Sequence, residues 1–120
     1  MGHYFDNIVI PVPRAKLDAY RAMSEKSGAI WKEHGALSYT EAVADDVKPG
    51  KVTSFPQALQ LKDDEVAVVA WVVYASRADR DKAMEKVMAD PRLADMMKHE
   101  NMPFDGARMF WGGFSSMVEL

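Results

Sequence analysis

The spacing of apolar residues in the first part of the chain changes from strand-like to helix-like. His3–Ile10 is rich in β-branched and aromatic residues and is followed by Pro11 and Pro13, so we expect a strand that ends before Pro11. Over residues 14–34, apolar positions recur every three or four residues, which predicts an amphipathic helix. Gly35 ends this helix, because glycine readily takes the left-handed conformation found just beyond a helix C-terminus.

Two further segments have the patterns of strands, and a long segment without a clear pattern separates them. Ala36–Ala44 alternates between two classes of side chain, as a strand with two different faces does. Val66–Tyr74 is apolar at both parities, which is typical of a central strand covered on both faces. Asp45–Asp64 contains the turn signal Pro49-Gly50, and we expect it to be a loop.

The last part of the chain carries start and stop signals for an interrupted helix and a final strand. Ser76, with Asp79 three residues later, is a helix N-cap signal, and Asp90-Pro91 ends that helix and starts a short one. A turn at Asp105-Gly106 leads into Arg108–Leu120, an aromatic-rich segment that we expect to be the fourth strand.

The predicted order β-α-β-β-α-β is that of the ferredoxin-like α+β fold, in which two helices cover one face of a four-stranded antiparallel sheet. We expect a single domain over residues 1–120. The other face of the sheet is left bare, although Val66–Tyr74 is apolar on both sides. Since apolar patches of this size rarely persist on monomers, we expect a homodimer, in which two sheets pack together as a dimeric α+β barrel.

Composition and charge exclude several classes of protein. The chain has 120 residues and no cysteine, which excludes disulfides, a thiolate nucleophile and Cys-ligated metals. No stretch approaches the roughly 20 apolar residues of a membrane span, and the N-terminus lacks the features of a signal peptide, so we expect a soluble cytoplasmic protein without a membrane partner. The net charge of -3, without a basic stripe, argues against a nucleic-acid partner.

Several short strings carry a resemblance to a known family. The chain resembles the YbaA-like bacterial family, a domain of unknown function, over nearly its whole length. The strings that match are Ile10–Pro13, Trp31–Leu37, Ala44–Gly50, Thr53–Pro56, Met88–Arg92 and Met102–Gly106. The resemblance implies a dimeric α+β barrel, an architecture shared by small monooxygenases, isomerases, haem-degrading enzymes and stress-response proteins. It implies no particular reaction, because the family has none established.

Two residues are candidates for acid–base chemistry. Glu41 lies between Tyr39 and Val43 on one strand face, and burial among apolar neighbours raises the pKa of a carboxyl toward that of a usable base or acid. The alternative is a carboxylate at the barrel rim, bonded to Tyr39 or paired with Arg108. His34, at the end of the first helix, is either a proton shuttle, a ligand or a helix-end cap.

Aromatic residues from three strands are candidates for a ligand pocket. Tyr39, Trp71 and Trp111, with Arg108 nearby, have the composition of a small-molecule site, although core packing explains the aromatic residues equally well. Thr53–Leu61 is either a lid over the pocket or an arm that packs on a second subunit.

The sequence gives no support for a metal or a cofactor. His3 and His99 lack companions at the spacing that places two ligands on one helix face, so we predict no metal site. Two function classes remain. The first is an enzyme or binding protein that takes a small apolar molecule in the barrel, of the cofactor-independent oxygenase or isomerase type. The second is a noncatalytic accessory or stress-related homodimer.

Overall fold

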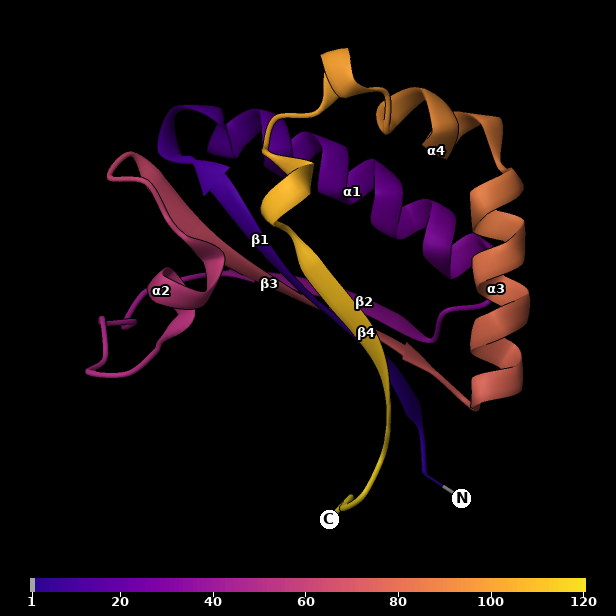
Figure 1. Cartoon of the computed structure of the whole chain (residues 1–120). Helices are drawn as coiled ribbons and strands as arrows, with labels where there is room; N and C mark the ends of the chain where they lie inside the picture. The colour runs from indigo at the N-terminus through magenta and orange to yellow at the C-terminus, as the bar shows by residue number, and fades with distance from the viewer. Residues whose placement is uncertain (1) are drawn as a thin grey trace.

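The computed structural model describes residues 2–120, apart from the side chain of His99, and these residues form a four-stranded antiparallel sheet with the order β2-β3-β1-β4. Helices α1, α3 and α4 lie on one side of the sheet, and α2 lies on the other (Figure 1). The elements are β1 (Tyr4–Pro13), α1 (Leu17–Glu33), β2 (Ser38–Val43), α2 (Phe55–Leu59), β3 (Glu65–Tyr74), α3 (Arg77–Ala89), α4 (Pro91–Met96) and β4 (Phe110–Ser115). This order confirms the predicted ferredoxin-like α+β fold.

The strand register fixes which side chains face the helices. Along β3, Val68, Ala70 and Val72 are buried beneath the helices, and the alternation of a strand places Trp71 on the opposite face. Glu41 of β2 pairs with Ala70, so it also faces the helices. The face with the even positions of β3 is called the helix face below, and the opposite one the open face.

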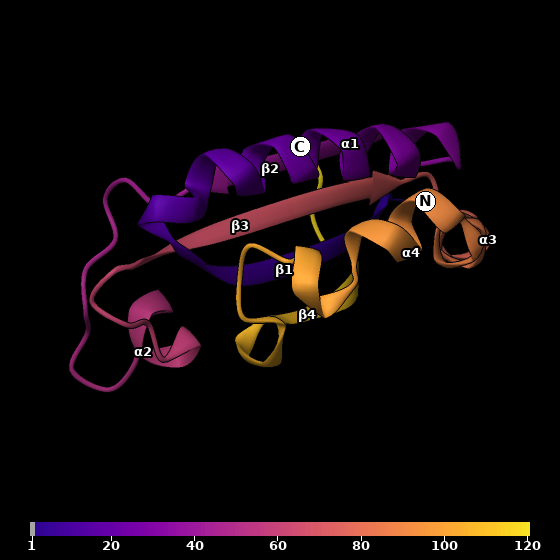
Figure 2. The same ribbon diagram turned by 90° about the horizontal axis from the view of Figure 1, so that it is seen from above.

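Two apolar clusters join the helices to the sheet. The first packs Ile30 and Trp31 of α1 against Val72 and Tyr74, and it includes residues of α3 and α4. The second packs Tyr20 of α1 against residues of β1 and β3. Figure 2 shows α1 running along β2 and β3, with α4 on the side of β1 and β4. The apolar face predicted for residues 14–34 is therefore the face that packs on the sheet.

Strand β1 is longer than the sequence analysis predicts, because its prolines lie inside it. Pro11 pairs with Ala67 and Pro13 with Glu65. Pairing with β4 covers only Tyr4–Val9, so no strand adjoins the other side of β1 at these prolines. Proline lacks a donor but is tolerated where its nitrogen points away from a partner strand. The expected end of the strand before Pro11 was wrong for this reason.

The loop over residues 45–64 and the C-terminal strand also differ from the prediction. Residues 55–59 form a helical turn, α2, with the Ser54 side chain accepting a hydrogen bond from the backbone of Gln57. Leu59 of α2 is 1% exposed, and α2 packs against β1 and β3 at one end of the open face. Strand β4 is only six residues long, because its pairing with β1 spans Phe110–Ser115 and not the whole predicted range.

The remainder of the open face is mostly apolar and accessible. Trp71 is 43% exposed there, although it occupies the strand that pairs on both edges. Phe110 and Phe114 of β4 pair with Val9 and Phe5 and extend the same surface. Within residues 2–120, no helix has both the length and the hydropathy that a membrane crossing requires.

Candidate functional site

A cleft of about 280 Å³ lies between the helices and the helix face of the sheet. Its walls come from all four strands, from α1, α3 and α4 and from the segment before β4, and most of them are apolar. Five methionines line the cleft: Met23, Met84, Met88, Met97 and Met109. Methionine side chains adapt to irregular apolar partners, so this wall suits an apolar molecule. The volume is near the lower end of those usual for small-molecule sites, about 300 Å³.

Glu41 is the hub of a hydroxyl cluster on the wall of this cleft. Tyr20 donates a hydrogen bond to Oε1 of Glu41, and Ser24 donates one to Oε2. The Tyr39 hydroxyl donates a second bond to Oε2, with an O–O distance of 2.6 Å. The carboxylate is half-buried, and these three donors replace the water that it would bind in solution.

Regular secondary structure brings the four residues together. Tyr20 and Ser24 are four residues apart on α1, and they therefore lie one above the other on the same helix face. Tyr39 and Glu41 are two residues apart on β2, so both side chains point to the helix face. The sequence analysis selected Glu41 and Tyr39 but missed Ser24 and the role of Tyr20. The sequence did contain one signal for them. Tyr20 and Ser24 are four residues apart on the predicted helix, and this helix packs against the strand that carries Glu41.

The tyrosines of the cluster remain protonated hydrogen-bond donors well above neutral pH. Burial raises the pKa of Tyr20, and the negative charge of Glu41 and its hydrogen bond raise it further. The pKa of Tyr39 is raised by the same causes, again with burial the largest. Both phenols therefore act as neutral donors to the Glu41 carboxylate.

A second carboxylate on the cleft wall, Asp6 of β1, is held in a buried ion pair. Asp6 is 2% exposed and accepts bonds from Nε and Nη2 of Arg80, at 3.2 and 3.1 Å to Oδ1. The Tyr74 hydroxyl donates to Oδ2 at 2.9 Å. The Arg80 guanidinium also lies over the ring of Tyr4, 5.3 Å from its centroid. The sequence analysis did not select Asp6, since its partner Arg80 is 74 positions away.

The structure separates the other predicted ligand-binding residues. Trp111 lines the cleft, as do Glu41 and Tyr39. Trp71 does not: it pairs with Thr40 of β2 and lies on the open face, across the sheet from Glu41. The expectation that Trp71 neighbours Glu41 was wrong, because their two positions have opposite parity in the register.

Arg108 does not contact Glu41 either, and its hydrogen bonds go to other residues. Its guanidinium forms a bidentate ion pair with Glu65, with distances of 2.7 and 2.5 Å. It also donates to the Gln60 carbonyl at 2.9 Å and to Asp105 at 2.9 Å. These bonds hold the pKa of Glu65 below its usual range. Arg108 thus joins the end of α2 to β3 and to the turn before β4.

The segment that includes α2 does not close this cleft. Residues 55–59 pack on the open face, against β1 and β3, as Figure 1 shows. Among the residues of Thr53–Leu61, none lines the cleft. The first alternative for this segment, a lid over the pocket, was therefore wrong, and the second, an arm that packs on a second subunit, stays a prediction.

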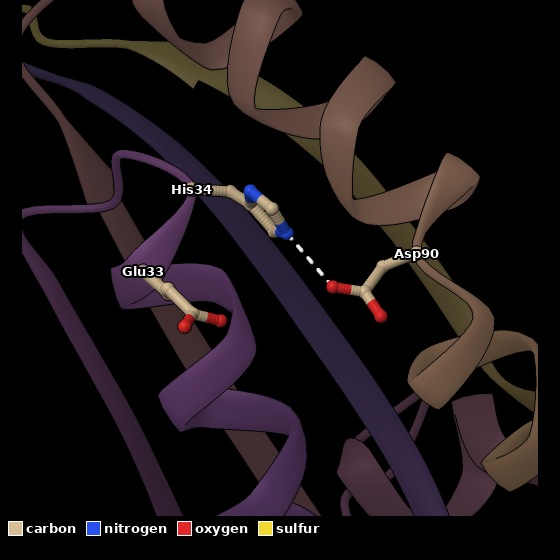
Figure 3. Close-up of side chains that lie close together, drawn as sticks. All are labelled: Glu33, His34 and Asp90. Carbon is tan, nitrogen blue, oxygen red and sulfur yellow. Dashed lines mark hydrogen bonds and ion pairs between the residues drawn. The ribbon is translucent and has the colours of Figure 1, made fainter.

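His34 caps α1 and contacts the junction of α3 and α4. Its backbone donates to the Ile30 carbonyl, and its Nε2 lies 2.9 Å from Oδ2 of Asp90 (Figure 3). Ligand atoms of Glu33, His34 and Asp90 lie within 4.8 Å of one another, as in a cation site. Arg92, however, forms ion pairs with both Glu33 and Asp90. The arrangement is therefore an ion-pair network that ties the helix ends together, and His34 does not line the cleft.

The back of the Glu41 cluster faces a second, more open cavity. A groove of about 500 Å³ runs between α1 and β2 and shares Tyr20, Tyr39 and Glu41 with the cleft. Ser24 lines only the groove, whereas Ser27, three residues further along α1, lines only the cleft. The cluster therefore forms a wall between a polar groove and an apolar cleft.

The fold and the cleft define an α+β protein of ferredoxin-like topology with a small, mostly apolar cavity in each chain. The chain belongs to the family described as "Protein of unknown function (DUF1428)", whose model matches residues 3–106. It is 45% identical over 116 residues to "Uncharacterized protein YbaA" of Escherichia coli K12, covering 97% of each chain, and equally to that of Shigella flexneri. The predicted resemblance to the YbaA-like family is confirmed.

Solved structures show similarity in fold at low sequence identity. A dimeric ferredoxin-like protein from an uncultured marine organism aligns with a TM-score of 0.65 at 10% identity, covering 100% of both chains. A mutant of SnoaB, a cofactor-independent oxygenase from Streptomyces nogalater, aligns with a TM-score of 0.63 at 12% identity over 100% of this chain and 98% of that one. A nipsnap family protein of unknown function from Agrobacterium tumefaciens aligns with a TM-score of 0.54 at 14% identity. The alignment covers 96% of this chain and 88% of that one.

Proposed function

We propose that the cleft binds a small, mostly apolar molecule and that Glu41 removes a proton from it. The observation that carries the proposal is the position of the carboxylate, which three hydroxyls fix at one wall of an otherwise apolar cavity. A general base must be held at hydrogen-bond distance from the proton that it takes, in a site with little water. Glu41 is the residue of the cleft that meets this requirement.

The step assigned to Glu41 is proton transfer from an acidic C–H or O–H bond of the bound molecule. The proton moves to Glu41, and the electron pair of the broken bond stays on the substrate, delocalised over a conjugated carbonyl or ring. In an isomerisation, Glu41 returns the proton to a different carbon atom. In a cofactor-independent oxygenation, the same carbanion reacts with dioxygen as the second substrate. The SnoaB neighbour, named as a cofactor-independent oxygenase, supports this reaction type through its fold.

We also propose that the protein is a homodimer formed through the open face. Trp71, Phe110 and Phe114 are each at least 43% exposed on one continuous sheet surface. Monomers rarely expose apolar surface of this extent. The marine-organism neighbour is named as a dimeric ferredoxin-like protein, which supports the same assembly here. Because the cleft lies on the helix face, each subunit of such a dimer has its own site.

The test begins with native mass spectrometry of protein taken directly from cells, to identify a retained small molecule. We expect its binding to be lost in Ala70→Leu, because Ala70 is buried in the floor of the cleft beside Glu41. Ala78→Leu, an exposed position on α3, is the matched control and should retain it. For the identified molecule, Glu41→Gln should keep binding and abolish turnover, since the amide has nearly the same shape and is not a base.

A noncatalytic role is the second candidate, and one observation favours it. Among the described side chains, which exclude that of His99, every buried polar atom has a hydrogen-bond partner, including those of the Glu41 cluster. Such a cluster serves equally well to fix α1 to β2. In that case Glu41→Gln should lower the melting temperature and leave binding of any retained molecule unchanged, because a hydrogen bond to a charged group contributes about 1.5 to 3 kcal/mol.

A further inference from the structure

The acceptor capacity of Glu41 is not fully used within the protein. Each carboxylate oxygen accepts about two hydrogen bonds. Oε2 receives two, from Ser24 and Tyr39, whereas Oε1 receives only one, from Tyr20. Oε1 therefore retains one acceptor site, and Tyr20 and Glu41 line the cleft as well as the groove. A molecule in the cleft that carries an O–H or N–H group can donate to this atom.

The polar hydrogens around the carboxylate are not available to a ligand. The hydroxyls of Tyr20 and Tyr39 both direct their hydrogens to Glu41. Burial and the charge of Glu41 raise the pKa of each phenol, so each has a single hydrogen and this one is already donated. A ligand oxygen that can only accept therefore finds no free phenol hydrogen beside Glu41.

The charges on the cleft wall are also of one sign. Among the described residues that line it, the ionisable groups with a negative charge are Asp6 and Glu41, and no lysine, arginine or histidine is present. Asp6 is neutralised by Arg80 and has both oxygens occupied by Arg80 and Tyr74. An anion in the cleft would thus lie beside the Glu41 carboxylate without a compensating cation, and burial of an unpaired charge is strongly unfavourable.

We infer that the cleft selects an uncharged, mostly apolar molecule with one hydrogen-bond donor aimed at Oε1 of Glu41, and that it rejects carboxylates and other anions. This inference rests on the proposed function, since it names the class of molecule for the same site. It also names the atom that receives the proton: Oε1 is the oxygen that the bound donor contacts, while Oε2 is held by Ser24 and Tyr39.

Matched probes on one apolar scaffold test the selection directly. The probes are 2-naphthol, which donates, 2-methoxynaphthalene, which only accepts, and 2-naphthoate, which is an anion at neutral pH. A second set with one ring, made of phenol, anisole and benzoate, tests the same three chemical groups on a scaffold smaller than naphthalene. Binding is measured by calorimetry and by quenching of indole fluorescence, because Trp31 and Trp111 both line the cleft.

We expect the alcohol to bind at least about tenfold more tightly than the methyl ether, the lower end of what a hydrogen bond to a charged acceptor provides. The carboxylate should bind more weakly than either. In Glu41→Gln the preference for the alcohol over the ether should fall toward one. Ala78→Leu, the exposed control on α3, should leave the preference unchanged.

Two sets of results would overturn these statements separately. Equal affinity for the alcohol and the ether, or affinity for the carboxylate as high as for the alcohol, would refute the inferred selection while leaving the cleft as a binding site. If no uncharged probe of either set binds, or if Ala70→Leu leaves their binding unchanged, the proposed function itself is refuted, and the inference with it. Should Glu41→Gln fail to fold, the comparison of probes on the unmodified protein still decides.

Discussion

The backbone of Gly28 on α1 lies directly against the ring of Tyr39 on β2. A β carbon at Gly28 would lie 2.6 Å from Cδ1 of Tyr39, closer than nonbonded carbon atoms approach. Glycine within a helix costs about 1 kcal/mol relative to alanine. The close approach explains its presence, because it allows the Tyr39 ring to pass under α1 and its hydroxyl to reach Glu41.

Gly28→Ala should therefore destabilise the protein by about 1 to 3 kcal/mol, the usual effect of overpacking, in spite of the better helix propensity of alanine. The displaced Tyr39 ring should also weaken binding of any probe that donates to Glu41. Urea unfolding and calorimetry measure the two effects. In a Tyr39→Ala background, the same substitution should stabilise the protein, by up to about 1 kcal/mol. Destabilisation in both backgrounds would contradict this account.

Asp6→Asn should destabilise the fold strongly, because it leaves the Arg80 guanidinium without its main partner. The side chain of Asp6 is 2% exposed and that of Arg80 is 14% exposed. Breaking a buried ion pair costs about 3 to 5 kcal/mol, and we expect the lower end of this range because Arg80 keeps some exposure. Asp81 also pairs with Arg80, but its side chain is 53% exposed. Asp81→Asn is thus the control, with an expected change within about 0.5 kcal/mol in urea unfolding.

Arg108→Gln should lower stability without affecting ligands of the cleft. The substitution leaves Glu65, whose side chain is 4% exposed, without the cation that lowers its pKa. A lowered pKa in the folded state stabilises the protein above the unfolded pKa of about 4.5, and this contribution is lost as the pH falls. The difference in melting temperature between the unmodified protein and Arg108→Gln should therefore be larger at pH 7 than at pH 3. If Arg108→Gln instead changed the affinity of the cleft for the probes, Arg108 would have to contribute to ligand binding.

Trp71→Asp should dissociate the proposed homodimer, because it places an unpaired charge in the centre of the open face. Light scattering measures the effect as a fall from about twice the chain mass of 13.4 kDa to that mass. Ala22→Asp, at an exposed position of α1 on the other side of the sheet, should remain dimeric. A stable monomer of the unmodified protein at micromolar concentration would refute the dimer at once.

The protein should lose stability in alkaline solution through its buried tyrosines. Burial and neighbouring carboxylates raise the pKa of Tyr20, Tyr39 and Tyr74 above 10. A raised folded pKa gives a contribution that is complete below the unfolded value of about 10 and is lost as the pH rises toward the folded value. Denaturation midpoints should thus fall above about pH 10. Phenolate absorbance from these residues should appear together with unfolding and not before it.

The periodicity of the sequence was sufficient to predict the fold. Val66–Tyr74, apolar at both parities, is indeed a strand paired on both edges. The side of α1 that packs on the sheet was predicted from the spacing of its apolar residues. The prolines of β1 and the short α2 were not predicted. Their structures depend on which neighbours pack against them, and local propensity does not contain that information.

The candidate site was only partly predictable, for a reason of register. Glu41 and Tyr39 share a face because they are two positions apart on one strand, a relationship that the sequence contains. Whether Trp71 joins them depends on the pairing of β2 with β3, where a shift by one residue exchanges the faces. Arg108 was misassigned because its partner Glu65 lies 43 positions earlier in the chain, and charge pairs at that separation have no local signal.

The prolines at the end of β1 also determine how this sheet can meet other chains. Beyond Val9, β4 no longer covers β1, so the edge at Ile10–Pro13 has no neighbouring strand. An edge of this kind normally offers a template on which a foreign strand can add and start aggregation. Pro11 and Pro13 offer no N–H group there. Association through this edge is thereby blocked, whereas the broad aromatic surface of the open face stays accessible.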